Sequence, residues 1–137
     1  MAREILIGYD GTPGAHAAAT EGLRLAKDLG VGVVVGFAYG TSPLGGEAGD
    51  LRDSLRELGE KRLAEVLAEA EAAGVPARAE LVDDRPAEGL VSLAEDHDAQ
   101  MIVIGSYGET PLKGAILGST PHRLLHLSER PVLVVRG

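Results

Sequence analysis

The sequence has no cysteine and no tryptophan, and aromatic residues make up only 3% of it. Without thiols, disulfide bonds and thiolate chemistry are excluded. The scarcity of aromatic side chains argues against single-stranded nucleic-acid grooves and flavin sandwiches, which hold their ligands on aromatic platforms. The core must therefore be aliphatic, built from Leu, Val, Ile and Ala.

Basic residues are also few, since 13 Lys and Arg stand against 21 Asp and Glu, giving a formal net charge of -8. Non-specific nucleic-acid binding needs a basic surface, so we expect no nucleic-acid partner. No apolar run approaches the roughly 18 residues of a membrane helix, and the first residues carry no signal-peptide pattern. We therefore expect a cytoplasmic protein without membrane contact. An acidic protein can still bind a polyphosphate locally, through amide dipoles, a few cations and a metal ion.

The chain alternates between apolar runs and amphipathic stretches, and its 137 residues are typical of one domain, 1–137. The pattern predicts strands at 3–8, 31–39, 77–82, 100–104 and 131–136, and helices at 13–29, 51–73, about 83–97 and 119–127. Such alternation favours an α/β three-layer sandwich, with helices on both faces of a five-stranded parallel sheet. If the strand order is 3-2-1-4-5, the loops after the first and fourth strands flank the point where the order reverses, where such sheets bind ligands.

The helix spacing also predicts which residues face the core. For the first helix these are Ala18, Gly22, Leu25, Ala26 and Leu29, and for the second Leu51, Leu55, Leu58, Leu63, Val66, Leu67 and Ala70. The strand at 77–82 carries Arg78 and Glu80, which is typical of a sheet edge. The glycine-rich stretch 40–50 predicts a surface loop.

A glycine-punctuated loop follows the fourth strand, with Gly105, Gly108, Gly114 and Gly118 before a helix that begins at Ser119. Glycines let the backbone approach an oxyanion, and the first N–H groups of a helix point at it. The hydroxyls of Ser119 and Thr120 can add donors. The loop therefore predicts a phosphate site, in which Lys113 is either a phosphate contact or a solvated surface lysine.

Asp10 follows the first strand and has two interpretations: it faces the ligand or its metal ion, or it serves the start of the first helix. Other phosphate motifs do not fit, because Gly114–Ser119 lacks the lysine of G-x-x-x-x-G-K-[ST]. His122 and His126 have the spacing of a zinc-protease helix, but Arg123 stands where that motif requires Glu.

The pattern Gly105-x2-Gly108-x9-Gly118-Ser119 is similar to the nucleotide-binding signature of the universal stress protein family, in its ATP-binding branch. The resemblance covers the whole chain and includes 9–12, 86–88 and 130–135, and it implies the five-stranded order 3-2-1-4-5. It implies binding of ATP, with ADP or AMP as alternatives, together with Mg²⁺ or Mn²⁺. It implies a site made of Gly8, Tyr9, Asp10, Thr12, Ala38, Ile104, Gly105, Gly108, Lys113, Gly118, Ser119 and Thr120. In it, Asp10 reaches the ribose, the phosphates and the metal ion, and the backbone of Ala38 meets the adenine edge. It also implies a homodimer through the last strand, 131–135.

The chain departs from the family pattern at two places. Glu109 and Thr110 stand where members often have basic residues, and Phe37 and Ala38 replace a more usual His-Val pair. We expect a regulatory nucleotide binder with at most slow ATP hydrolysis and no dedicated catalytic residue. The alternatives are a nucleotide-free dimeric interaction module of the same fold and an adenylating ligase, although the phosphate loop of such ligases is absent after the first strand. A flavodoxin-like electron carrier is disfavoured by the scarce aromatics.

Overall fold

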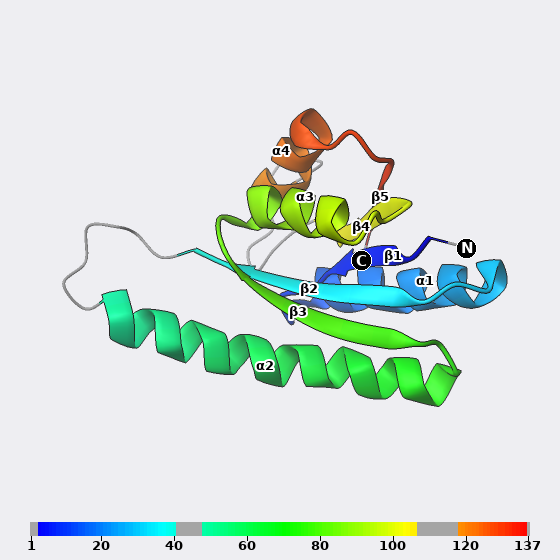
Figure 1. Cartoon of the computed structure of the whole chain (residues 1–137), viewed down its shortest axis with the longest axis horizontal. Helices are drawn as coiled ribbons and strands as arrows, with labels where there is room; N and C mark the ends of the chain where they lie inside the picture. Colours follow the sequence, from blue (N-terminus) through cyan, green and yellow to red (C-terminus); the bar gives the residue numbers. More distant parts are fainter. Residues whose placement is uncertain (1–2, 41–47, 107–117, 137) are drawn as a thin grey trace.

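The computed structural model describes residues 3–40, 48–106 and 118–136, in which strands and helices alternate (Figure 1). In chain order the elements are β1 (Ile5–Gly8), α1 (Pro13–Leu29), β2 (Val33–Tyr39), α2 (Ala48–Ala73), β3 (Ala77–Asp83), α3 (Pro86–Asp96), β4 (Met101–Gly105), α4 (Ser119–Leu127) and β5 (Val132–Val135). The predicted alternation is confirmed. Among these helices, none combines the length and apolarity needed to cross a bilayer.

The sheet is five-stranded, all of its pairings are parallel, and its order is β3-β2-β1-β4-β5. The predicted α/β class and strand order are therefore confirmed. The central strand β1 pairs with β2 on one side, where Ile7 lies opposite Val35, and with β4 on the other, where Ile7 lies opposite Val103. The chain thus builds one half of the sheet through β3 and then crosses back to β4. This reversal leaves the carboxyl ends of β1 and β4 side by side with open space above them.

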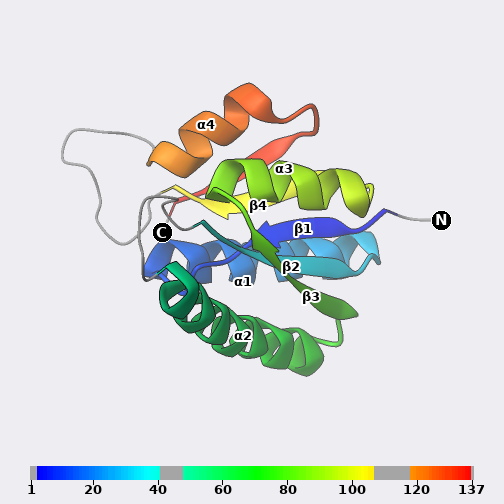
Figure 2. The ribbon, with the colours of Figure 1, turned by 60° about the vertical axis from the view of Figure 1, so that its left-hand side comes forward.

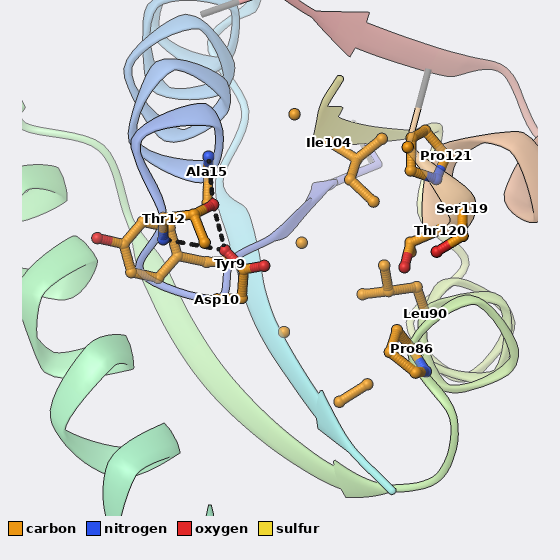
Figure 3. Close-up of a pocket in the computed structure, with 15 residues that line it drawn as sticks. Tyr9, Asp10, Thr12, Ala15, Pro86, Leu90, Ile104, Ser119, Thr120 and Pro121 are labelled. Atoms are coloured by element: carbon orange, nitrogen blue, oxygen red, sulfur yellow. Dashed lines mark hydrogen bonds between the residues drawn. The ribbon is translucent and has the colours of Figure 1, made fainter. Parts of the chain in front are cut away.

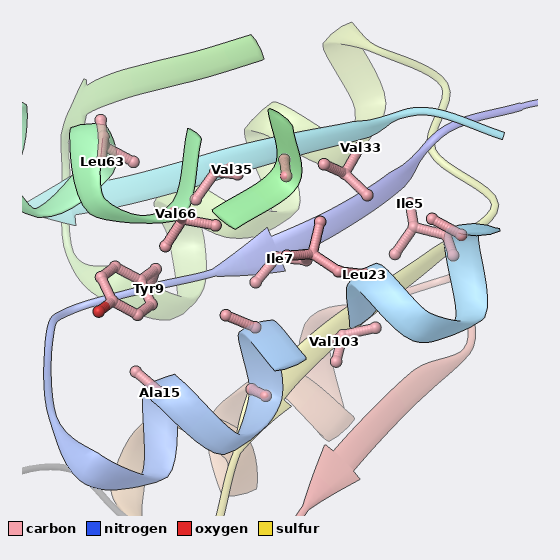
Figure 4. Close-up of a cluster of buried hydrophobic side chains, with 14 of the residues drawn as sticks. Ile5, Ile7, Tyr9, Ala15, Leu23, Val33, Val35, Leu63, Val66 and Val103 are labelled. Carbon is pink, nitrogen blue, oxygen red and sulfur yellow. The ribbon is translucent and has the colours of Figure 1, made fainter. Parts of the chain in front are cut away.

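Two apolar clusters cover the two faces of the sheet, and alternate residues of one strand belong to different clusters. Ile5 and Ile7 pack with α1 and α2 (Figure 4), whereas Leu6 packs with α3 and α4. These three side chains are fully buried, which explains why β1 is a continuous apolar run rather than an alternating one. Figure 2 shows the pairs of helices on opposite sides of the sheet.

The ends of α1 follow the expected helix chemistry. Thr12 is its N-cap and accepts a hydrogen bond from the Ala15 N–H at 3.3 Å, and Pro13 takes the first helical position. Gly30 ends the helix in the left-handed region, with φ of 70°. Thr12 thereby sets both the start of α1 and the shape of the loop after β1.

Some predicted helix faces were wrong. Leu29 is 50% exposed, Leu51 is 52% exposed and Leu58 is 39% exposed, although all three were expected to face the core. Gly59 takes the buried position beside Leu58, because a Cβ there would lie 2.5 Å from Leu81 Cδ2 and 2.7 Å from Phe37 Cδ1. The pattern of leucines therefore misplaced the inner face of α2 by one residue at this turn.

Three element boundaries also differ from the prediction. The second helix begins at Ala48, so residues 48–50 are not part of the loop expected over 40–50, and 41–47 lie outside the described residues. β3 extends through Asp83, so α3 begins only at Pro86. The outer position of β3, inferred from its polar residues, is confirmed.

Candidate functional site

A pocket of about 150 Å³ lies at the carboxyl ends of β1, β2 and β4, where the strand order reverses (Figure 3). Its walls come from strand ends, from the loop after β1, and from the first turns of α1, α3 and α4. The lining residues are Gly8, Tyr9, Asp10, Thr12, Ala15, Gly36, Ala38, Pro86, Leu90, Ile104, Gly105, Gly118, Ser119, Thr120 and Pro121.

Ten of the twelve predicted site residues line this pocket: Gly8, Tyr9, Asp10, Thr12, Ala38, Ile104, Gly105, Gly118, Ser119 and Thr120. Gly108 and Lys113 lie outside the described residues, as do Glu109 and Thr110. Sequence reasoning missed Ala15, Gly36, Leu90 and Pro121 and did not assign Pro86 to the site. Gly36 could have been found from the sequence, because it stands two residues before Ala38 and residues two apart on a strand point to the same side.

The Asp10 carboxylate is held by the loop it belongs to. Its Oδ1 accepts hydrogen bonds from the Thr12 N–H at 3.0 Å and from the Thr12 hydroxyl at 2.6 Å. The same hydroxyl oxygen caps α1. The second carboxylate oxygen of Asp10 points across the pocket toward Thr120 (Figure 3). The two interpretations of Asp10 are therefore compatible, since one oxygen organises the helix start and the other remains available to a ligand.

Gly105 allows the end of β4 to pass close to the start of α1. A Cβ at this position would lie 2.5 Å from the carbonyl oxygen of Gly14 and 3.1 Å from the Ala15 nitrogen. The next residue, Ser106, donates its N–H to Val135 and accepts the N–H of Gly118 at 2.6 Å. The chain thus enters and leaves 107–117 at neighbouring points, and α4 begins beside the end of β4.

The start of α4 presents free backbone donors to the pocket. Gly118 is its N-cap, so no side chain caps the helix, and its first turn contains no acidic residue. Ser119 is exposed and Thr120 is half-buried, and both line the pocket. Uncapped N–H groups and the helix dipole favour an anion at this end.

The backbone of Ala38 faces the pocket from the other side. Along β2, the carbonyls of Gly32 and Gly36 accept the N–H groups of Ile5 and Tyr9, so even-numbered residues of β2 turn toward β1. The bond between Tyr9 and Gly36, 3.0 Å long, is the last rung of this ladder. Ala38 is two residues further on, so its N–H and C=O point past the end of β1 into the pocket it lines. One donor and one acceptor therefore stand side by side there.

The pattern that defines the Universal stress protein family matches residues 1–136. The chain belongs to this family. The universal stress protein MJ0531 of Methanocaldococcus jannaschii is 31% identical over 139 residues, covering 98% of this chain and 82% of that protein. The universal stress protein Rv2005c of Mycobacterium tuberculosis is 32% identical over 134 residues, covering 96% of this chain, and the chain spans only 45% of its length.

Solved structures of the family share the fold. The structure of MJ0577, also from Methanocaldococcus jannaschii, has a TM-score of 0.88 at 27% identity, covering 100% of this chain and 97% of that one. A universal stress protein in complex with cAMP has a TM-score of 0.78 at 26% identity, covering 97% and 96% of the two chains.

In this universal stress protein, Tyr9 connects the pocket loop to α2. Its side chain is buried, and its hydroxyl donates to Glu65 Oε2 at 3.0 Å. Because that proton goes to Glu65, the ring N–H of His16, 2.9 Å away, donates to the hydroxyl oxygen. Burial raises the pKa of Tyr9 above its usual range, and the hydrogen bond to Glu65 adds to the rise. The residue before Asp10 is thereby anchored on two helices.

An ion pair joins α3 and α4 on the other side of the pocket. Arg123 Nε on α4 donates to Glu88 Oε1 on α3 at 2.7 Å, and Arg85 lies 2.7 Å from the other carboxylate oxygen. The hydrogen bond from Arg123 is the main cause that lowers the pKa of Glu88. Pro86 and Leu90 of α3 and Ser119 and Thr120 of α4 all line the pocket, so this contact ties together two of the elements that form it.

Proposed function

We propose that this chain is a regulatory universal stress protein, forming one nucleotide-binding domain that binds ATP, or ADP or AMP, in the pocket at the strand-order reversal. The observation that carries the proposal is the combination found in one pocket. An unpaired donor and acceptor at Ala38 stand at one end, and the uncapped start of α4 stands at the other. These are the groups that an adenine edge and a phosphate require.

The adenine end is apolar apart from the backbone of Ala38. Pro86, Leu90 and Ile104 supply flat aliphatic contacts for the faces of a base. The amino group of adenine would donate to the Ala38 carbonyl and its N1 would accept the Ala38 N–H. Backbone recognition of this kind does not depend on the side chain, which explains why alanine can occupy the position.

The phosphate end combines the start of α4 with Asp10. The N–H groups of α4 and the hydroxyls of Ser119 and Thr120 would hold the phosphates. Mg²⁺ is usually bound by one or two carboxylates together with phosphate oxygens. The free oxygen of Asp10 fits this role for Mg²⁺ or Mn²⁺ carried in with the nucleotide. In the described residues no group of three His, Asp or Glu side chains could hold a metal ion alone.

The universal stress protein of similar fold that was solved with cAMP supports an adenine nucleotide as the ligand. Slow hydrolysis at most is expected, because Asp10 is the one carboxylate in the described lining and Thr12 already engages it. We also propose a homodimer through β5, an outer strand of the described sheet whose Leu133 is 36% exposed. The cytoplasmic location stays a prediction.

Isothermal titration with ATP and Mg²⁺ tests the proposal, with Asp10→Asn compared against Asp28→Asn, the same change at an exposed position at the far end of α1. We expect Asp10→Asn to weaken Mg²⁺–ATP binding at least about tenfold, or about 1.4 kcal/mol, and to change AMP binding little. Asp28→Asn should leave both unchanged.

Gly118→Val should abolish binding of both nucleotides while circular dichroism shows an intact fold. Absence of any nucleotide binding at millimolar ATP would remove the proposal and favour the nucleotide-free interaction module. Absorbance of the purified protein gives an independent check, since a chain without tryptophan shows bound adenine clearly near 260 nm.

A further inference from the structure

The edge of the sheet formed by β3 has open backbone groups. Val33 of β2 donates to the Pro76 carbonyl at 2.8 Å, and the register places Ala79 opposite Val35 and Leu81 opposite Phe37. Along a strand, the backbone N–H and C=O groups of successive residues point to opposite sides. Those of Arg78 and Glu80 therefore point toward β2, and those of Ala77, Ala79 and Leu81 point outward. Within the described part of the chain, no strand lies beyond β3.

The side chains along this edge are self-complementary in charge. Arg78 and Glu80 lie on one face of β3, and their side chains are 57% and 42% exposed. Arg78 contacts Glu4, and Glu80 lies 3.4 Å from His97 Nε2. If an identical strand pairs antiparallel with β3 and Ala79 stands on the two-fold axis, each Arg78 lies opposite Glu80 of the second copy. The two copies of Ala79 then form a hydrogen-bonded pair across the axis, and each uses its outward N–H and C=O groups.

The opposite face of the edge is apolar. Beside β3 lies an open groove of about 380 Å³, whose apolar lining is formed by Leu63, Ala64 and Leu67 of α2 with Ala79 and Leu81 of β3, and which Glu80 also borders. Arg56 and Glu60, 3.6 Å apart, stand at its rim. Figure 2 shows α2 running along β3. A second copy related by the same two-fold axis brings its own α2 beside this groove and covers it.

We propose that a second copy of this chain docks on the β3 edge, antiparallel and centred on Ala79, and extends the sheet across the interface. Edge strands commonly resist pairing by carrying charge, and like charges directly opposite each other across a strand pair are destabilising. Here the opposite charges of Arg78 and Glu80 attract in this register and select it over shifted ones. The contact is separate from the β5 dimer, and the two together would build assemblies larger than a dimer.

Disulfide trapping tests the geometry, because the chain has no cysteine of its own. Ala79→Cys places the single thiol on the proposed axis, where a hydrogen-bonded antiparallel pair has Cα atoms about 5.5 Å apart, within disulfide reach. We expect mild oxidation to convert most of the Ala79→Cys protein to a covalent dimer. Thr20→Cys, exposed on α1, is the matched control and should stay largely monomeric. Equal cross-linking of both variants would overturn the proposal, and the assay is blind to a β5 dimer.

Charge reversal tests the register. Arg78→Glu places two pairs of like charges across the axis, so sedimentation analysis of the full chain should show the dissociation constant of the β3 contact rising at least about tenfold. The double variant Arg78→Glu with Glu80→Arg should return it to within about threefold. Both variants lose the contact between Arg78 and Glu4, so this loss cannot explain a dissociation constant that recovers in the double variant. A failed rescue with both variants folded, or an Ala79→Cys variant that cross-links only with another protein, would overturn the proposal.

Discussion

Replacing Gly105 by alanine should destabilise the protein and damage the pocket. The new Cβ would lie 2.5 Å from the Gly14 carbonyl oxygen and 2.6 Å from its carbon. Both are backbone atoms in the first turn of α1, so they cannot rotate away as a side chain would. Either the end of β4 or the start of α1 must shift, and Asp10 and Thr12 are bonded to that helix start.

The size of the effect follows from the rigidity of the neighbour. Overpacking a core typically costs about 1–3 kcal/mol, and a contact with backbone belongs at the upper end of that range. Gly22→Ala is the matched control, since its Cβ would lie 2.8 Å from both Cδ1 and Cγ1 of Ile7, which belong to a side chain and not to the backbone. Alanine also gains about 1 kcal/mol over glycine inside a helix. We therefore expect Gly105→Ala to lose about 3 kcal/mol and Gly22→Ala less than about 1 kcal/mol.

Urea unfolding followed by circular dichroism measures both variants, and the midpoint should fall with an unchanged slope. Gly105→Ala should also bind Mg²⁺–ATP at least about tenfold more weakly, at a temperature where it is fully folded. If Gly105→Ala unfolds within about 0.5 kcal/mol of the wild type, the close approach of β4 to α1 does not constrain this position, and the reasoning fails.

Two further predictions concern titratable contacts around the pocket. Tyr9→Phe removes the hydroxyl shared by Glu65 and His16 and should cost about 1 kcal/mol near neutral pH. Because folding raises the pKa of Tyr9, its protonated form stabilises the native state below about pH 10, and this stabilisation is lost as the pH rises further. The free energy of unfolding, measured with urea at pH 8 and at pH 11, should fall less between these two pH values in Tyr9→Phe than in the wild type. An equal fall in both proteins would contradict this. Glu88→Gln removes a carboxylate whose pKa Arg123 lowers, so the stability difference from the wild type should be present above about pH 4.3 and vanish as the pH falls through the lowered pKa. A difference that persists at pH 2 would show that packing, not charge, is what Glu88 contributes.

Most of the architecture could be predicted from the sequence because its signals are local. The buried run at Ile5–Gly8, the cap at Thr12 and the stop at Gly30 each act within a few residues. The strand order was also predicted, although it rests on family resemblance and on general rules of parallel sheets. The inner face of α2 was not predicted correctly, because Gly59 faces the core only where Phe37 and Leu81 lie close by. No feature of the helix itself reveals those neighbours.

The candidate site also contains residues that could be predicted from the sequence and residues that could not. Its glycines and hydroxyls stand at the boundaries between strands and helices, where the sequence marks them directly. Leu90 and Pro121 escaped prediction because they reach the pocket only after α3 and α4 have packed together, through contacts such as that between Glu88 and Arg123. Their apolar character in the sequence is indistinguishable from that of ordinary core residues.

By itself, then, the amino-acid sequence determined the alternation of strands and helices, the aliphatic core and the places where the chain breaks beside a ligand, since these depend on short-range conformational preference and on periodicity. Tertiary structure alone decided that the backbone of Ala38 would remain unpaired and that the backbone groups of Ala79, rather than those of Arg78 and Glu80, would turn to the open edge. Both depend on how β2 is aligned with its neighbours β1 and β3. That is a property of register, which is settled by packing over the whole sheet and is not encoded in any one segment.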